Sequence, residues 1–212
     1  EITESYNYGN EDTTFFNKIA PILIGYISFF FVFLISGIAL LKERTSGTLD
    51  RLLATPVKRS EIIFGYTISY GFLAIIQTIV ITLSAIYLLK IEVAGSLVYV
   101  IIVNMLLALG ALALGMLLST AAKSEFQVMQ FIPLVIIPQM FFTGIVPVES
   151  MGKVAVYISK VLPVTYSGDG LSKIILEGKN LLDIKGDIIA LTIFFVVLIT
   201  LNIIGLKRYR KV

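Results

Sequence analysis

The chain has 212 residues, of which 57% are hydrophobic and 15% are charged, and its formal net charge is +3. Soluble globular domains carry about 25% charged residues, so this composition indicates a polytopic membrane protein. Cysteine and histidine are both absent, which excludes disulfides, thiolate metal sites and histidine-dependent metal chemistry. The small net charge reflects loop topology in a membrane protein and does not indicate nucleic-acid binding.

Residues 1–19 form a polar, acidic lead-in, which we expect to be the end of an extracytoplasmic domain or a linker. The chain opens at Glu1 without a methionine and without the basic and apolar regions of a signal peptide. From this unusual start we expect further sequence upstream.

Five long apolar runs follow, and together they predict a permease-like membrane domain over residues 20–206 with a basic tail at 207–212. The runs are continuous rather than alternating, and open sheets cannot cross lipid, so we expect helices. The fold class predicted is all-α, with five transmembrane helices, a cytoplasmic helix and short outer re-entrant or interfacial helices. The predicted spans are residues 20–41, 62–89, 97–121, 128–146 and 188–206.

A polar hinge, residues 42–65, separates the first two runs. If it is cytoplasmic, alternation places on its side all five arginines of the chain, Arg44, Arg51, Arg59, Arg208 and Arg210, while the other side carries only lysines. This is the distribution that the positive-inside rule predicts. Within the hinge, Leu49, Leu52 and Leu53 have helical spacing and Pro56 ends the helix. The stripe is compatible with a helix resting in the headgroups and with a helix that docks on a partner.

The hinge sequence ERTSGTLDRLLATP (residues 43–56) resembles the cytoplasmic motif of type-2 ABC transporter permeases, the transmembrane subunits of ABC exporters. FFTGIVPVESM (141–151) and LPVTY (162–166) are similar to that family's segment after its fifth helix. The resemblance implies helices two to six of a six-helix permease, without the first helix and most of the extracytoplasmic domain. It also implies a dimer, homo- or heteromeric, and a hinge that docks on an ATPase subunit. The implied contact comprises Glu43, Arg44, Gly47, Thr48, Leu49, Asp50, Arg51, Leu52, Leu53 and Pro56.

Polar side chains inside the spans have two interpretations: they line a path, or they hold helices together. Asn104 and Gln139 are the candidates for the path. Ala111, Gly115 and Ser119 form a face of small residues that allows close helix approach, either within the subunit or across a dimer. The outer segment suggests a lid-like cap or an exit gate, for which the candidates are Phe142, Gly144, Pro147 and Tyr157. Asp169, in a Gly-Asp-Gly sequence, is interpreted as a turn or helix-start residue.

The chain has no G-x-x-x-x-G-K-[ST] loop, so it cannot bind ATP by that mechanism. We therefore expect no catalytic residues, metal or cofactor in this chain, with ATP and Mg²⁺ bound by a partner. The predicted function is the membrane-spanning subunit of an ATP-driven exporter of amphiphilic or hydrophobic substrates. Its partners would be an ATPase subunit, a second permease subunit and lipids of a prokaryotic cell membrane. The alternatives are a non-transporting scaffold or channel-like subunit, and, less favoured, a fragment of a secondary transporter.

Overall fold

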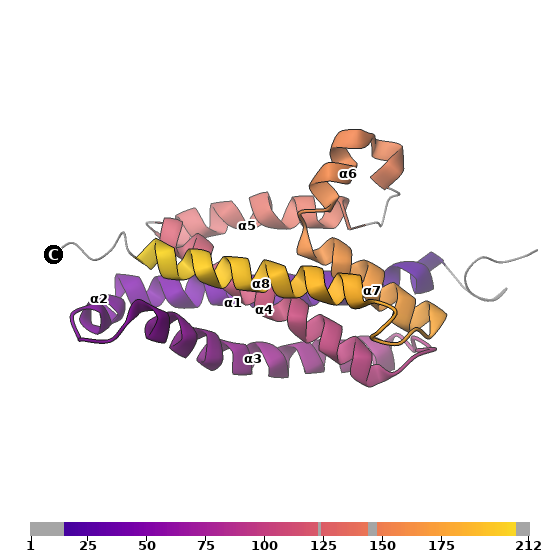
Figure 1. Ribbon diagram of the computed structural model, residues 1–212, viewed down its shortest axis with the longest axis horizontal. Helices are drawn as coiled ribbons and strands as arrows, with labels where there is room; N and C mark the ends of the chain where they lie inside the picture. Colours follow the sequence, from indigo (N-terminus) through magenta and orange to yellow (C-terminus); the bar gives the residue numbers. More distant parts are fainter. Residues whose placement is uncertain (1–14, 123, 144–147, 207–212) are drawn as a thin grey trace, which may run out of the picture.

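The computed structural model describes residues 15–122, 124–143 and 148–206. Throughout these residues the regular structure is helical, and no strand occurs. Figure 1 shows the long helices side by side along the longest axis of the molecule. In chain order the elements are α1 (Phe15–Thr45), α2 (Thr48–Leu53), α3 (Arg59–Leu88), α4 (Leu97–Ala121), α5 (Glu125–Phe141), η1 (Val148–Met151), α6 (Lys153–Ser159), α7 (Pro163–Glu177) and α8 (Lys185–Gly205).

Four of the helices, α1, α3, α4 and α8, are long and apolar enough to cross a membrane. Even the shortest of them, α8 with 21 residues, reaches across a hydrocarbon core of roughly 30 Å at about 1.5 Å per residue. The prediction of an all-α polytopic membrane protein is therefore confirmed. The first helix begins at Phe15, earlier than the expected residue 20, so the end of the lead-in is helical.

The fifth apolar helix, α5, is shorter than its predicted span of residues 128–146. It has 17 residues and runs from Glu125 to Phe141, passing through Pro133 and Pro138. The last three positions of that span, 144–146, lie outside the described residues. At about 1.5 Å per residue α5 is roughly 25 Å long, slightly less than the hydrocarbon core.

Helix α4 is the centre of the bundle and packs against α1, α3, α7 and α8. Its small residues allow this. A Cβ added at Gly115 would lie 2.6 Å from the carbonyl oxygen of Phe33 and 3.0 Å from the backbone nitrogen of Gly37, both on α1. Ala111, Gly115 and Ser119 are all buried within the chain. The face of small residues therefore makes its close contact inside the subunit, against α1.

The two ends of the bundle differ. One end, here called the hinge end, carries α2 and the segment that leads from it into α3 (Figure 1). The other, the loop end, carries α7 and the connection between α3 and α4. Helix α6 projects from the side of the bundle near the loop end (Figure 1).

Helix α7 is the element that the sequence did not predict. It is amphipathic, and its buried face packs against α1, α4 and α8. Asp169 therefore lies inside a helix, and its interpretation as a turn or helix-start residue is wrong. Lys173 Nζ, one turn further on, lies 2.5 Å from Asp169 Oδ2 and 3.3 Å from Oδ2 of Asp187 on α8. This charge cluster joins α7 to the first turn of α8.

Candidate partner-binding hinge and membrane groove

The hinge is a short helix held between two tight turns. Gly47 precedes α2 with φ of 76°, a left-handed conformation in which a glycine carries no Cβ penalty. Helix α2 ends at Leu53, three residues before Pro56. The next helix starts with the side chain of Glu61 accepting a hydrogen bond of 2.9 Å from the backbone nitrogen of Lys58. The hinge therefore has a defined entry and exit.

Arg44, in the last turn of α1, forms hydrogen bonds with the C-terminal end of α4. Its Nη1 donates to the backbone carbonyl oxygen of Ser119 and, at 2.9 Å, to that of Ala122. Both carbonyls belong to the C-terminus of α4, where backbone acceptors lack intrahelical donors and the helix dipole favours a cation. The guanidinium thus ties α1 to α4 directly beside α2.

Helix α2 divides into a buried and an exposed face. The side chain of Leu49 is 1% exposed and belongs to the core of the chain, with Leu52 and Leu53 half-buried against the same core. The expectation that Leu49 faces a partner is therefore corrected: it anchors α2 to its own bundle. The exposed residues of α2 and of the segment that leads from it into α3 are Thr48, Asp50, Arg51, Ala54, Thr55, Pro56, Val57 and Lys58.

The predicted path residues have structural partners inside the chain. Asn104 is fully buried, and its Nδ2 donates to Ser28 Oγ at 3.0 Å and to Thr82 Oγ1 at 2.7 Å, which joins α4 to α1 and α3. Gln139 is 2% exposed, and its Oε1 accepts from the backbone nitrogen of Val164 at 3.4 Å. Of the two interpretations of these residues, the structure favours the one in which they hold helices together.

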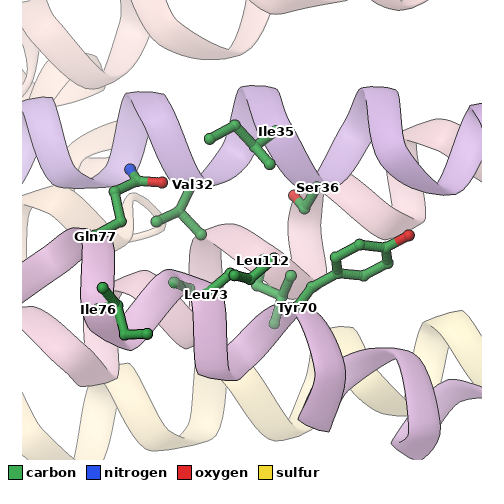
Figure 2. Close-up of a pocket in the computed structure, with 9 residues that line it drawn as sticks. Val32, Ile35, Ser36, Tyr70, Leu73, Ile76, Gln77 and Leu112 are labelled. Atoms are coloured by element: carbon green, nitrogen blue, oxygen red, sulfur yellow. The ribbon is translucent and has the colours of Figure 1, made fainter.

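A groove of about 290 Å³ opens instead between α1 and α3, with Leu112 of α4 at its base (Figure 2). Gln77 brings a polar group to this apolar groove, and Figure 2 shows its amide directed toward α1. The Nε2 atom is buried without a hydrogen-bond partner within the described structure. The groove is lined by Val32, Ile35, Ser36, Tyr70, Leu73, Ala74, Ile76, Gln77 and Leu112.

Two of the four predicted gate residues, Phe142 and Tyr157, lie within the described residues. The carbonyl oxygen of Phe142 accepts a hydrogen bond of 3.0 Å from Thr165 Oγ1 of α7. Tyr157 lies on α6 with 70% of its surface exposed. Gly144 and Pro147 lie outside the described residues. Phe142 is thus a contact between the end of α5 and the start of α7.

Among the residues that the structure describes, no three acidic side chains gather into a potential metal site. The hinge carries charged side chains of both signs, with exposed Lys42, Arg51 and Lys58 beside Asp50 and Glu61.

Comparison with known proteins gives a family. The model of the ABC-2 type transporter family matches residues 4–176. The chain is 30% identical over 175 residues to ABC transporter G family member 20 of Dictyostelium discoideum, covering 82% of this chain and 24% of that protein. It is 24% identical over 147 residues to the probable multidrug ABC transporter permease YbhS of Escherichia coli strain K12, covering 68% and 39% respectively. It is 28% identical over 148 residues to the linearmycin resistance permease protein LnrN of Bacillus subtilis strain 168, covering 69% and 38%. No solved structure gave a significant match.

The chain therefore belongs to the ABC-2 type transporter family and is a multi-pass membrane protein, a permease component of an ABC transporter. It spans from about a quarter to less than half of the length of these relatives. Two of these relatives, YbhS and LnrN, are named as permeases.

Sequence reasoning missed three features of these sites. Arg44 was assigned to a partner because a cation beside a docking motif gives no sign that it folds back onto a helix 75 residues away. Gln77 is a polar residue within a predicted span, but its position in a groove depends on how α1 and α3 pack, which the sequence does not show. Lys173 could have been found from its i, i+4 spacing to Asp169, had α7 been predicted as a helix.

Proposed function

We propose that this chain is the membrane-spanning subunit of an ABC exporter and that the exposed face of its hinge docks on a separate ATPase subunit. The observation that supports this most is the rigid attachment of α2. Leu49 is buried in the core, and Arg44 joins the adjoining end of α1 to the end of α4. A push on α2 would therefore be passed to the two helices that pack most closely in the bundle rather than lost in a mobile loop.

The positive-inside distribution supports a cytoplasmic location for the hinge. The membrane that we propose is the cell membrane of a prokaryote. There the mixed charges of Asp50, Arg51 and Lys58 would set the orientation of a partner, with exposed Ala54 and Val57 providing apolar contact. The ATP and Mg²⁺ would be bound by the partner. A second permease subunit, identical or related, would complete the translocation path.

The docking is tested by reversing charge at the exposed position Arg51. Arg51→Glu should reduce co-purification of the ATPase subunit by about tenfold or more, because like-charge contacts at an interface cost several kcal/mol. Lys153→Glu makes the same change on exposed α6, away from the hinge, and should leave co-purification unchanged. Equal retention of the ATPase by both variants would contradict docking through this face.

The groove between α1 and α3 is the best candidate for substrate contact. Its apolar walls and the amide of Gln77 suit an amphiphilic or hydrophobic molecule. We expect Leu73→Trp, which narrows the groove, to change ATP-driven efflux of an amphiphilic fluorescent dye from vesicles. Phe72→Trp enlarges an exposed neighbour that does not line the groove and should not change it. Equal efflux by the two variants would exclude this groove from the path.

A further inference from the structure

A second groove, of about 400 Å³, lies between α8 and the segment that joins α6 to α7. The wall on α8 is one apolar helix face, because its lining residues are spaced at i, i+3, i+4 and i+7. These residues are Ala190, Ile193, Phe194 and Val197. The opposite wall contains Tyr166 and the only cationic side chain of the lining, Lys160.

This groove opens to the outside of the chain rather than into its core. The side chains of Ile193 and Val197 are 57% and 50% exposed, and that of Val161, also in the lining, is 72% exposed. On α8 the run without charged side chains begins at Ile188, so the groove starts near the level at which the hydrocarbon of a bilayer would begin. A molecule in this position would have an apolar part along α8 and a polar part at Lys160.

Lys160 is held at the rim of the groove. The hydroxyl of Tyr166 donates a hydrogen bond of 2.7 Å to the carbonyl oxygen of Lys160, which fixes the turn between α6 and α7. The Lys160 ammonium lies 6.0 Å from the centre of the Tyr157 ring. Among the described side chains no carboxylate lies within salt-bridge distance of it, whereas Lys173 and Lys179 are both ion-paired. A lysine ammonium beside an apolar groove is complementary to an anionic lipid, which has a negative headgroup and apolar acyl chains.

We propose that this groove binds one anionic phospholipid, with an acyl chain along the α8 face and the headgroup phosphate at Lys160. The volume falls within the range of sites that hold small molecules. A lysine near a membrane surface contributes attraction for anionic lipid that corresponds to about a fivefold change in affinity. The site is separate from the hinge, and its occupation does not depend on the proposed ATPase docking.

The headgroup contact is tested by lipid titration of the delipidated full-length permease, followed by native mass spectrometry. The lipids are phosphatidylglycerol and phosphatidylcholine with the same acyl chains. Lys160→Gln should weaken binding of phosphatidylglycerol about fivefold and leave phosphatidylcholine unchanged. Lys153→Gln removes the same charge from an exposed position of α6 that does not line the groove, and should change neither. Equal effects of the two variants would overturn the assignment.

The acyl-chain contact is tested by filling the groove with Ala190→Phe, which should reduce binding of both lipids. Ile189→Phe, at an exposed neighbour outside the lining, is the matched control. Undiminished lipid binding by Ala190→Phe would overturn the proposal. If the variant instead dissociates a permease dimer while lipid binding persists, the groove is an interface between copies. If Lys160→Gln alters only the KM for a transported dye, the occupant is the transported molecule rather than a membrane lipid.

Discussion

The guanidinium of Arg44 donates a hydrogen bond of 2.9 Å to the backbone carbonyl oxygen of Ala122, across 78 positions of the chain. This contact joins the last turn of α1 to the C-terminus of α4, beside the hinge helix α2. Since α4 also packs against α3, α7 and α8, a displacement of the hinge would reach most of the bundle through this junction.

Removal of the Arg44 side chain tests the junction. Arg44→Ala should lower the free energy of unfolding by about 1.5–3 kcal/mol, the usual range for hydrogen bonds to a charged group. The effect is measured as a shift in the thermal unfolding midpoint of the purified protein. Arg51→Ala removes an exposed guanidinium from α2 and should have an effect within about 0.5 kcal/mol. Similar losses in the two variants would show that Arg44 has no special role in stability.

The contact between α1 and α4 should be intolerant of one methyl group. In Gly115→Ala the new Cβ would meet the backbone of Phe33 and Gly37, which cannot move without shifting α1. Overpacking of this kind costs about 1–3 kcal/mol. Gly65→Ala is the control: no atom lies within 4 Å of its added Cβ, and an alanine in a helix should stabilise by about 0.5–1 kcal/mol. Thermal unfolding midpoints that fall for Gly65 but not for Gly115 would contradict the packing.

Asn104 should act through stability rather than through substrate selection. Asn104→Ala removes its bonds to Ser28 and Thr82, and interhelical bonds of this kind contribute about 0.6 kcal/mol on average. Thr192→Ala changes an exposed residue whose hydroxyl bonds only within its own helix and should be nearly neutral. The measurements are unfolding midpoints and dye efflux at matched protein amounts. If Asn104→Ala altered the preference among transported dyes and left stability unchanged, Asn104 would instead line the translocation path.

Lys173 should stabilise the attachment of α7 to α8. Lys173→Met leaves Asp187, which is buried, without its cation, so we expect a loss of about 1–3 kcal/mol in the free energy of unfolding. Lys179→Met breaks an exposed pair with Glu177, which solvent screens, and should lower stability much less than Lys173→Met does. Thermal unfolding midpoints distinguish the two variants. Equal losses of stability in both would show that the ion pairs of Lys173 contribute no more than an exposed surface pair.

The pH dependence of this cluster follows from the pKa of Lys173. Burial lowers that pKa, but the hydrogen bond and charge of Asp169, together with Asp187, outweigh it and raise the pKa above the ordinary value. A raised lysine pKa gives a stabilisation that is fully present below the unfolded value of about 10.4 and is lost as the pH rises through the folded value. The difference in the free energy of unfolding between the protein and its Lys173→Met variant should therefore be constant from pH 6 to about 9.5. It should shrink only at higher pH, which unfolding midpoints measured across this range would show.

The long helices could be predicted because composition alone determines them. Residues 97–121 contain no charged side chain, and the predicted bounds agree with those of α4. The small residues around Gly115 predicted close packing, yet the partner helix could not be named because the pattern is the same within a subunit and between subunits. Helix α7 was missed because Gly168 and Gly170 are typical of turns, whereas here both are buried inside a helix.

The hinge was predicted as a short helix after a membrane span, and the structure places one there. The direction of its leucines could not be read from spacing, because a stripe at i, i+3 and i+4 fits a lipid surface, a partner or the chain's own core. The structure buries Leu49 in the core and leaves the polar flank outward. The central claim to test is consequently that the exposed face of α2 contacts the ATPase subunit.

Site-specific cross-linking tests this claim most directly, because the chain contains no cysteine and one introduced thiol is unique in it. Arg51→Cys, labelled with a photoactivatable cross-linker in membranes that contain the whole transporter, should form a covalent product with the ATPase subunit. Tyr157→Cys, exposed on α6, should form none. A product from position 157 and none from position 51 would contradict the account, because the hinge would then not face the ATPase.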